Sequence, residues 1–565
     1  MNEEIQELQA EIDALPKGSV TKKLINNTYY YYHQWKDASG KRHYDIVSEI
    51  EAFGLKEKIV RRRELEKRLK ALAKEFEKYD IGYHDDSQEP ELMTNAMYGE
   101  ELSDMVSVAR EFEKRDCYAI IDRYIHSPAG DNVCLLYGLR RTGKTTIIRQ
   151  VILNMNDKEF SKAVYIKAKQ SDTMADINKD LKNLRRHGFR YVFVDEVTLI
   201  NDFIDSASLF SDVYAAGGMK IVLSGSDSLG LFIASNEELY DRAVTVHTTF
   251  IPFREHARLL GINSVDEYIR YGGTLKAGEL NSENKDVNSD EASFRDDEST
   301  HRYIDTAICR NIQHSLKFYE DGGHFRHLKK LYEADELTNA INRVIQDMNH
   351  EFTKEVILGN KEIPGELCDT SDKLKKQEQI PEVVLEVRNY LREMEVVEYV
   401  EPLGRYVFTQ PGIRYCQAEA FVLKLLQSNE ARTLSEREKT QMEHMILGDI
   451  KRRMVEDTVF LETQKELPKS KKTFKLQFDT GELYMVLYDT KTDTCELYEM
   501  LHDDNATKVQ DNSLLKKENC DFVQRKYGKI VKKVALYQGK SDIGIDGCQY
   551  HNIADYLRSL SDATR

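Results

Sequence analysis

The most chemically informative residues of the chain form a glycine-rich loop. Residues Gly138 to Thr145 read G-x-x-x-x-G-K-T, with an apolar run at 132–137 before them and apolar residues at helical spacing over 146–153 after them. A strand, a glycine-rich loop and a helix in this order are typical of phosphate-binding loops, whose backbone N–H groups surround the phosphates. The amino end of the helix adds partial positive charge. The sequence therefore predicts a nucleotide site in which Lys144 reaches the β- and γ-phosphates and the Thr145 hydroxyl ligates Mg²⁺.

A pair of acidic residues follows the next predicted buried strand. Asp195 and Glu196 come directly after the apolar run 191–194. In P-loop enzymes the first acid holds the magnesium ion through water, and we expect Asp195 to do so. Glu196 is then placed to orient and deprotonate the attacking water. The alternative is that the two acids are only the polar start of a loop.

Two later segments carry polar residues next to predicted strands. Ser224 and Ser226 end the strand at 220–223, where hydroxyl groups can sense the γ-phosphate, although Ser-Gly-Ser is also a common turn. Arg242 precedes the strand at 243–247. An arginine there can stabilise transition-state charge in cis or from a neighbouring subunit, and the second case requires a homo-oligomer. The alternative is an ordinary surface arginine.

Together these patterns predict one site that uses ATP and Mg²⁺. The predicted nucleotide-binding residues are Gly138, Leu139, Arg140, Arg141, Thr142, Gly143, Lys144, Thr145, Thr146, Ser224 and Ser226. The predicted catalytic residues are Lys144, Glu196 and Arg242, and the predicted metal-binding residues are Thr145 and Asp195.

Composition places this site in a chain of several domains, because single cores rarely grow past about 250–300 residues and the chain has 565. There is no apolar run long enough to span a membrane, and the acidic start lacks the apolar core of a signal peptide. Eight cysteines without a C-x-x-C pair favour reduced thiols and argue against a zinc site. The sequence therefore predicts a cytoplasmic protein without membrane contact. The net charge of −16 disfavours non-specific nucleic-acid binding by the whole molecule.

Residues 1–79 are predicted to form a small aromatic and basic domain, a β-hairpin followed by a charged helix. The strands are expected at 29–36 and 43–47, and six basic residues face one acid between Lys17 and Arg42. Aromatic rings among basic residues suit stacking on DNA or RNA, whereas the alternative is a small sheet whose tyrosines cover the helix. The Leu-Pro-Lys-Gly and Tyr-Tyr-Tyr pattern resembles an uncharacterised bacterial domain, which implies no activity.

Changes in composition and pattern give the remaining boundaries. A helix at 382–391 followed by a hairpin at 396–400 and 405–408 is typical of a winged helix, a module that contacts DNA or proteins, although no basic recognition helix is evident. An α/β pattern follows it to the end of the chain. The predicted segments are a linker (80–102), the P-loop core (103–275), an acidic flexible insertion (276–300), a helical lid or connector (301–380), the winged-helix-like domain (381–419) and a C-terminal α/β domain (420–565).

From about Ser103 onward the chain resembles the prokaryotic AAA-type P-loop ATPases that carry a C-terminal restriction-endonuclease-like domain of the PD-(D/E)xK class. The resemblance implies a multidomain α/β fold, with Walker A and Walker B motifs in the first of these domains. The matching segments are 138–145, 194–196, 223–226, 252–255, 268–273 and 410–416.

The nuclease chemistry of that family needs a helix glutamate, a strand aspartate and a Glu-x-Lys pair, which bind a metal ion and stabilise charge. The resemblance implies that Glu456 and Glu499 stand in for the two glutamates. Tyr484 then occupies the aspartate position and Leu501 the lysine position. Hard cations require several oxygen ligands, so the sequence predicts a nuclease-like domain without nuclease activity. Glu482 and Asp489 lie nearby, which leaves a relocated metal site as the alternative.

The leading prediction is therefore a Mg²⁺-dependent ATPase whose ATP cycle switches its contacts with a partner protein, DNA or RNA. Two alternatives stay open. One is an ATP-controlled nuclease with a relocated metal site. The other is a signalling or binding module that holds ATP and hardly hydrolyses it.

Overall fold

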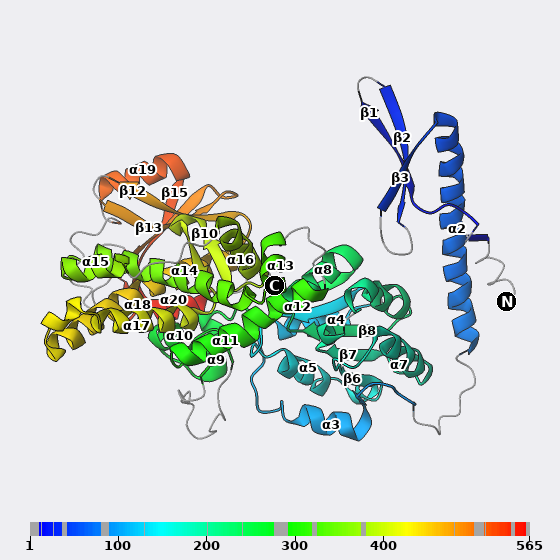
Figure 1. Cartoon of the computed structure of the whole chain (residues 1–565), viewed down its shortest axis with the longest axis horizontal. Helices are drawn as coiled ribbons and strands as arrows, with labels where there is room; N and C mark the ends of the chain where they lie inside the picture. The colour runs from blue at the N-terminus through cyan, green and yellow to red at the C-terminus, as the bar shows by residue number, and fades with distance from the viewer. Residues whose placement is uncertain are drawn as a thin grey trace. The chain divides into compact units, whose positions relative to one another are not determined.

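A computed structural model describes residues 11–12, 14–25, 28–36, 42–80, 90–128, 130–200, 202–239, 241–275, 292–318, 325–373, 380–478, 481–501, 514, 516–543 and 548–560. The chain divides into two compact units (Figure 1). The first comprises Met1–Glu91 with Lys182–Gly188, and the second comprises Leu92–Leu181 with Phe189–Arg565. In the described part of the chain, no helix combines the length and apolar character needed to cross a membrane.

The first unit contains an antiparallel sheet of three strands and a long helix. The strands are β1 (Ser19–Ile25), β2 (Thr28–Lys36) and β3 (Arg42–Val47), in that order across the sheet, and the helix is α2 (Glu49–Asp80). Strands β2 and β3 form the hairpin that the sequence predicts. Strand β1 was not predicted, since its lysine-rich sequence lacks apolar alternation. It pairs with β2 along its whole length.

The second unit begins with the P-loop core, a six-stranded sheet in the order β4-β6-β7-β8-β5-β9. Five strands are parallel, and the two-residue edge strand β4 is antiparallel to β6. Every residue of β5 is buried, as expected for a central parallel strand. The strands are β4 (Ala96–Met97), β5 (Val133–Tyr137), β6 (Ala163–Lys167), β7 (Tyr191–Asp195), β8 (Lys220–Gly225) and β9 (Ala243–His247).

Helices cover both sides of this sheet and lead out of it (Figure 1). Helices α3, α4 and α5 pack together on one face through apolar side chains of their buried sides. The helices of this region are α3 (Gly99–Ser107), α4 (Tyr118–His126), α5 (Lys144–Leu153), α6 (Asp157–Phe160), α7 (Met174–Arg186), α8 (Ser228–Ile233), α9 (Phe253–Leu260) and α10 (Val265–Tyr271).

Two predicted boundaries differ from the structure. The core begins before residue 103, because Ala96 and Met97 pair with β6 and α3 contributes the buried Leu102. The flexible insertion predicted for 276–300 also extends too far. Residues 276–291 lie outside the described residues, whereas Phe294 is fully buried against Tyr303. The backbone is fixed there by this aromatic contact together with hydrogen bonds of Ser293 to Arg141 and Thr274.

A helical region and a hairpin follow. The hairpin of β10 (Val397–Val400) and β11 (Arg405–Phe408) is antiparallel and follows the helix α16, as the sequence predicts, while the winged-helix assignment stays a prediction. The helices are α11 (Asp297–Tyr303), α12 (Arg310–Phe318), α13 (Arg326–Glu333), α14 (Leu337–Gly359), α15 (Gly365–Lys373), α16 (Pro381–Glu393) and α17 (Pro411–Leu426).

The C-terminal part is a second six-stranded sheet, in the order β12-β13-β14-β15-β17-β16. The first three strands form an antiparallel meander, and β14, β15 and β17 are parallel, with α19 between β14 and β15 in the chain. The elements are α18 (Glu436–Glu466), β12 (Lys471–Phe478), β13 (Gly481–Asp489), β14 (Thr494–Met500), α19 (Lys517–Tyr527), β15 (Lys529–Tyr537), β16 (Asp542–Ile543), β17 (Gln549–Asn552) and α20 (Ile553–Ser559).

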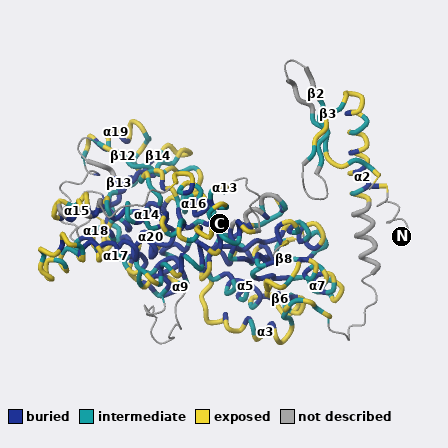
Figure 2. Tube along the Cα trace, viewed as in Figure 1, coloured by how far each residue is buried: buried dark blue, intermediate teal, exposed yellow. Residues whose placement is uncertain are grey.

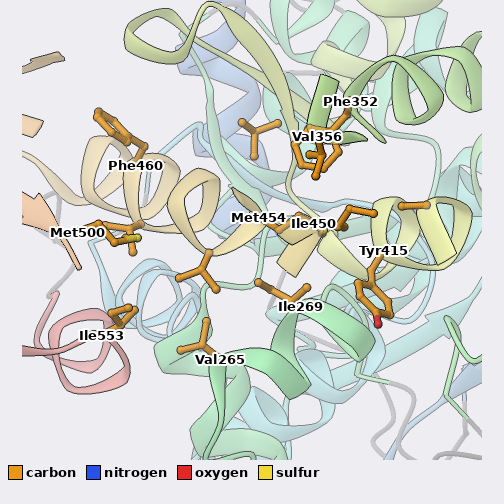
Figure 3. Close-up of a cluster of buried hydrophobic side chains, with 14 of the residues drawn as sticks. Val265, Ile269, Phe352, Val356, Tyr415, Ile450, Met454, Phe460, Met500 and Ile553 are labelled. Atoms are coloured by element: carbon orange, nitrogen blue, oxygen red, sulfur yellow. The ribbon is translucent and has the colours of Figure 1, made fainter. Parts of the chain in front are cut away.

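Helix α18 is the centre of the packing in this half of the second unit. Its buried side chains, among them Ile450, Met454 and Phe460, join one hydrophobic cluster with α9, α10, α14, α17, α20 and the C-terminal sheet (Figure 3). Buried residues gather where these elements pack together, whereas the first turns of α18 are mostly exposed (Figure 2). A displacement of α18 is therefore felt both by the P-loop core and by the C-terminal sheet, since close-packed interiors transmit strain.

Candidate functional site: the phosphate-binding loop and its acids

The loop between β5 and α5 has a backbone that only glycine can follow at two positions. Gly138 has φ +150°, and a Cβ there would lie 2.4 Å from the Thr248 hydroxyl oxygen. Gly143 has φ +89° and directly precedes α5. Side chains are strained in this region of φ. The two glycines of the motif thus explain why the loop can turn between strand and helix.

Lys144, the first residue of α5, folds back over the loop. Its Nζ donates hydrogen bonds to the carbonyl oxygens of Gly138 at 2.8 Å and Leu139 at 2.9 Å. Burial lowers the pKa of Lys144, and the charges of Glu196 and Asp195 act in the opposite direction. The ammonium group is therefore held in the loop by two carbonyl dipoles, and two nearby carboxylates partly offset the cost of its burial.

The acids and hydroxyls of the site meet because three parallel strands end at one edge of the sheet. Asp195 ends β7 and Ser224 lies near the end of β8, while Thr145 follows β5 through the loop. The Asp195 carboxylate accepts hydrogen bonds from the hydroxyls of Thr145 at 2.8 Å, Tyr165 at 2.8 Å and Ser224. Asp195 is 1% exposed, so all three hydroxyls hold a buried charge that would be costly without partners.

Glu196 lies beside this group in a different backbone conformation. It is one of few non-glycine residues with positive φ, +58°, a conformation that costs energy and often marks functional sites. Its carboxylate accepts hydrogen bonds from the Ser226 N–H at 3.2 Å and the Ser226 hydroxyl at 3.0 Å. The two strand ends of β7 and β8 are therefore joined a second time, through Glu196 and Ser226.

A cleft of about 380 Å³ opens at this edge of the sheet. A volume of this size fits a small-molecule ligand. It is lined by Arg140, Arg141, Gly143, Lys144, Thr145, Thr146, Glu196, Leu199 and Ser226. The lining combines loop N–H groups, one ammonium, two guanidiniums and a hydroxyl ligand with one carboxylate. These residues fit a nucleoside triphosphate with its divalent cation, since phosphate needs N–H donors and cations and Mg²⁺ needs hard oxygen ligands.

The structure therefore brings most of the predicted residues together, with three differences inside the loop. The side chain of Leu139 is fully buried in a cluster with the helices after residue 292, and only its carbonyl reaches Lys144. The Thr142 hydroxyl donates to the Leu139 carbonyl at 2.8 Å. Arg141 donates to the Ser293 hydroxyl at 3.0 Å, and its carbonyl accepts from the Leu275 N–H.

Arg242 is not brought to this site. Strand β9 runs parallel to β5, with Val133 opposite Ala243 and Tyr137 opposite His247. Arg242 precedes β9 and so lies at the amino ends of the strands, whereas the loop leaves from their carboxyl ends, about 13 Å away at 3.3 Å per residue. Its guanidinium pairs with Asp212 and the carbonyl of Glu238. An arginine before a strand is on the wrong edge of a parallel sheet to act in cis.

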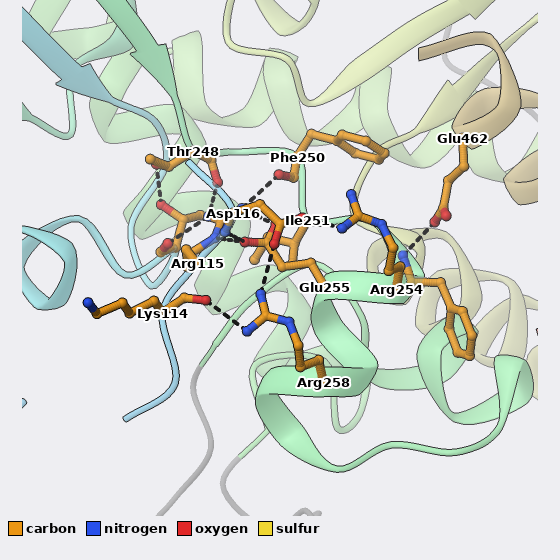
Figure 4. A network of polar contacts seen from close by, with 12 residues as sticks. Lys114, Arg115, Asp116, Thr248, Phe250, Ile251, Arg254, Glu255, Arg258 and Glu462 are labelled. Carbon is orange, nitrogen blue, oxygen red and sulfur yellow. Dashed lines mark hydrogen bonds and ion pairs between the residues drawn. The ribbon is translucent and has the colours of Figure 1, made fainter. Parts of the chain in front are cut away.

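One buried ion pair that supports the loop has no counterpart in the sequence prediction. Arg115 and Glu255 form a two-bond pair, with both distances 2.9 Å. The Arg115 guanidinium also donates to the carbonyls of Thr142, Thr248 and Phe250 (Figure 4). Burial opposes the charge of Arg115, but the Glu255 carboxylate outweighs it and raises the pKa. Glu255 could have been singled out, because it belongs to segment 252–255, which carries part of the family resemblance. No sequence pattern links it to Arg115.

A second set of contacts joins the loop after β8 to α12. Asp227 accepts hydrogen bonds from His314 Nδ1 and the Ser315 hydroxyl, both at 2.7 Å. The Asn311 side chain donates to the Ser226 carbonyl at 2.5 Å. The strand end that holds Glu196 through Ser226 is therefore attached directly to the helical region.

The acids predicted in the C-terminal domain do not converge. Glu456 lies on α18, and burial raises its pKa. Tyr484 is buried against Phe460 and donates its hydroxyl to the backbone carbonyl of Glu456 at 2.8 Å. The Glu499 carboxylate accepts from the N–H of Leu514, which belongs to the cluster on the other face of the sheet from α18. Side chains alternate along a strand, so Glu499 faces away from Glu456.

Leu501 packs in that same second cluster. The side chain of Glu482 lies outside the described residues, and Asp489 Oδ1 accepts from the N–H of Lys491 in the following turn. Among the described residues, no group of three or more His, Cys, Asp or Glu side chains is placed to hold a metal ion.

Comparison with known proteins agrees with the geometry of the loop. Residues 130–257 match the family described as an AAA domain, so this segment is an AAA-type P-loop ATPase domain. No curated protein matches the chain.

Similar solved structures include a Walker-type ATPase of Pyrococcus abyssi, with 13% identity, a TM-score of 0.31, and coverage of 54% of this chain and 95% of that one. Another is the ORC1 protein of Aeropyrum pernix in complex with DNA, with 13% identity, a TM-score of 0.21, and coverage of 62% and 98%. A DNA polymerase III gamma subunit-related protein of Thermotoga maritima has 14% identity, a TM-score of 0.20, and coverage of 60% and 100%. At these scores the argument about this chain rests on its own residues.

Proposed function

We propose that the chain is a Mg²⁺-dependent ATPase whose single hydrolytic site is the cleft at the carboxyl ends of β5, β7 and β8. The observation that carries the proposal is the 2.8 Å hydrogen bond between the Thr145 hydroxyl and the Asp195 carboxylate, beside the ammonium of Lys144. A hydroxyl and a carboxylate held together beside a phosphate-binding loop are the ligands that a phosphate-bound Mg²⁺ needs.

Each residue then has a physical role. Lys144 exchanges its two loop carbonyls for phosphate oxygens, whose negative charge would stabilise an ammonium group whose pKa burial lowers. Thr145 contributes a metal ligand, and Asp195 orients the metal's water ligands. The bound Mg²⁺ supplies neutralisation of charge on the phosphates. Arg140 and Arg141 line the cleft and add positive charge.

Glu196 is proposed as the group that activates water. In the conformation described here it is held by Ser226. Both bonds reach the same oxygen, Oε2, so releasing the Ser226 hydroxyl would free a lone pair of that oxygen for water, while the N–H bond keeps the side chain in place. Because Ser226 is attached to Asn311 on α12, the step that frees Glu196 also shifts the helical region. We propose that this link lets the nucleotide state change contacts with a partner.

The partner surface is proposed to include the first unit. There the rings of His33, Trp35 and His43 form a stack, with centroids 4.8 and 5.6 Å apart. Tyr44, which pairs with Gln34 and so lies on the other face of the sheet, is 70% exposed. Exposed rings next to basic residues suit single-stranded DNA or RNA.

The test measures ATP turnover by the full chain in Mg²⁺ and in EDTA, with and without single-stranded DNA, duplex DNA or RNA. Lys144→Ala should abolish ATP binding and turnover, whereas the exposed Lys158→Ala, a matched change on α6, should not. Turnover that persists in Lys144→Ala or in EDTA would contradict the proposal. Tight ATP binding with turnover near zero under every condition would instead favour a module that only holds ATP.

A further inference from the structure

A second cleft lies far along the chain from the phosphate-binding loop. It has a volume of about 300 Å³ and is formed by α14, α16, the β10–β11 hairpin and α17. Three arginines line it, Arg388, Arg405 and Arg414, together with the rings of Tyr399 and Tyr406. Its size falls at the lower end of the range for small-molecule sites. None of its lining residues lines the ATP cleft.

The floor of this cleft holds two guanidinium groups on one carboxylate. Asp457, which is 2% exposed, accepts hydrogen bonds from Arg405 through Oδ1 and from Arg414 through Oδ2. Arg414 is itself 3% exposed. The Asp457 carboxylate thus pairs with two guanidinium groups, the half-buried Arg405 and the buried Arg414. Burial, together with the neighbouring arginines, lowers the pKa of Arg414 to about 10.

Carboxylates already accompany the arginines of the floor. Glu355 lines the cleft and is paired with Arg453 at 2.5 Å. Glu351 also lines it, and the charge of Glu456 on α18 acts on both Arg405 and Arg453. The capacity to bind a further anion therefore rests chiefly on Arg388 at the wall of the cleft.

Arg388 on α16 has capacity to bind at the wall of the cleft. Its Nε is buried and has no hydrogen-bond partner among the described residues. The guanidinium stacks over the Tyr406 ring, with Cζ 5.7 Å from the centroid. Tyr406 in turn meets Tyr399, which is 43% exposed, edge to face. Stacked arginine and tyrosine groups with free N–H donors suit an anion that carries an aromatic ring.

We propose that this cleft is a binding site for a nucleoside phosphate, whose phosphate meets the Arg388, Arg405 and Arg414 guanidiniums and whose base packs against Tyr399. The phosphate supplies the anionic oxygens that the guanidiniums can bind in pairs. The base supplies a flat face for the exposed tyrosine. The site is separate from the ATP cleft, so the chain would have two nucleotide sites of different kinds.

The experiment uses the full chain with Lys144→Ala, so that the ATP cleft does not contribute. Adenosine 5′-monophosphate is titrated by calorimetry, with inorganic phosphate, adenosine and a ten-residue oligothymidylate as comparison probes. We expect one saturable monophosphate site per chain, with tighter binding than for inorganic phosphate or adenosine. Arg388→Ala should weaken binding at least tenfold, and Arg405→Gln should do the same. The solvent-exposed Arg392→Ala on the same helix should leave it unchanged.

Three outcomes would overturn the inference: no saturable binding of the monophosphate, binding that Arg388→Ala and Arg405→Gln leave intact, or binding of the oligonucleotide alone. Melting temperatures of each variant show whether the fold is kept, and Arg388→Ala should keep it because the buried Nε has no hydrogen-bond partner among the described residues and the change removes a stacking contact with Tyr406. The result is independent of the ATPase proposal, since the ATP cleft is disabled in every sample.

Discussion

The P-loop core and the C-terminal sheet both carry acidic side chains on or beside their strands, but the predicted acids meet their partners at one edge only in the core. In the core, Asp195 and Ser224 end neighbouring parallel strands and meet Thr145 at one edge. In the C-terminal sheet, Glu456 lies on the helix side and Glu499 on the other. Parallel strands collect side chains at their carboxyl ends, whereas alternation along a strand separates them by face. Strand direction and register, rather than the presence of acids, make the site.

The largest effect is expected for Glu196→Gln. Removing a general base costs about 10²–10⁴-fold in rate, while the amide oxygen can still accept from Ser226. ATP binding should persist and turnover should fall by that factor, as measured by calorimetry and phosphate release. Equal turnover in the variant and the wild type would remove Glu196 from the mechanism.

A paired change tests the comparison itself. Asp195→Asn should reduce turnover by about 10–100-fold, the usual cost of disturbing a group that orients a metal's ligands. Glu499→Gln, a change of the same size in the C-terminal sheet, should leave turnover unaltered and should not alter any effect on plasmid DNA or RNA in Mg²⁺ or Mn²⁺. Cleavage of DNA or RNA that disappears in Glu499→Gln would show that the C-terminal acids also form a site.

Breaking the buried ion pair between Arg115 and Glu255, which supports the loop, should lower the stability of the fold strongly. Glu255→Ala leaves Arg115 buried without its carboxylate, at a cost of about 3–5 kcal/mol. The control is Glu113→Ala, which breaks an exposed pair with Arg258 and should cost below about 1 kcal/mol. Urea unfolding followed by tryptophan-independent far-UV circular dichroism measures both. Equal stabilities of the Glu255→Ala and Glu113→Ala variants would mean that the Arg115–Glu255 ion pair does not support the loop.

The contact between α18 and α9 should depend on pH. Burial raises the pKa of Glu462 to about 8, and its carboxyl accepts from the Phe253 N–H at 2.6 Å. Above about pH 4.5, the ordinary pKa of a glutamate, the unfolded chain loses the Glu462 proton, whereas the folded chain keeps it until about pH 8. Stability should fall as pH rises from about 5 to 8, by up to about 1.4 kcal/mol per pH unit.

Glu462→Gln keeps the acceptor for Phe253 and removes the titration. Melting temperatures at pH 5, 6, 7 and 8 should show a shallower fall for the variant than for the wild type. The same slope in both would mean that Glu462 is not the titrating group.

The smallest effect is expected at Tyr484. We expect this residue of the C-terminal sheet to contribute to packing and not to a reaction. Tyr484→Phe removes the hydroxyl bond to the Glu456 carbonyl and keeps the ring against Phe460. The expected loss is about 1 kcal/mol with unchanged ATP turnover. A change in turnover without a change in stability would give this tyrosine a functional role.

The sequence predicted the local parts of the site and missed the parts that depend on distance. The loop, Asp195, Glu196 and Ser224 could be predicted because each is marked by a strand directly before it. Arg242 lies away from the loop of its own chain, because nearness to a strand does not say which end of the sheet a residue occupies, and its role from a neighbouring subunit stays a prediction. The Arg115–Glu255 pair joins residues 140 positions apart, and no periodicity encodes such a pairing. The order at residues 293–296 was missed because it comes from distant partners, as in the contacts of Phe294 with Tyr303 and Cys416.

The most direct test of the central claim counts Mn²⁺ ions, as a substitute for Mg²⁺, bound to the full chain by electron paramagnetic resonance. With a non-hydrolysable ATP analogue we predict one tightly bound Mn²⁺ per chain, lost in Lys144→Ala and weakened in Asp195→Asn. Without nucleotide we predict none, because Thr145 and Asp195 need phosphate oxygens to complete the site. Tight Mn²⁺ binding without nucleotide, removed by Glu456→Gln or Glu499→Gln, would contradict the account.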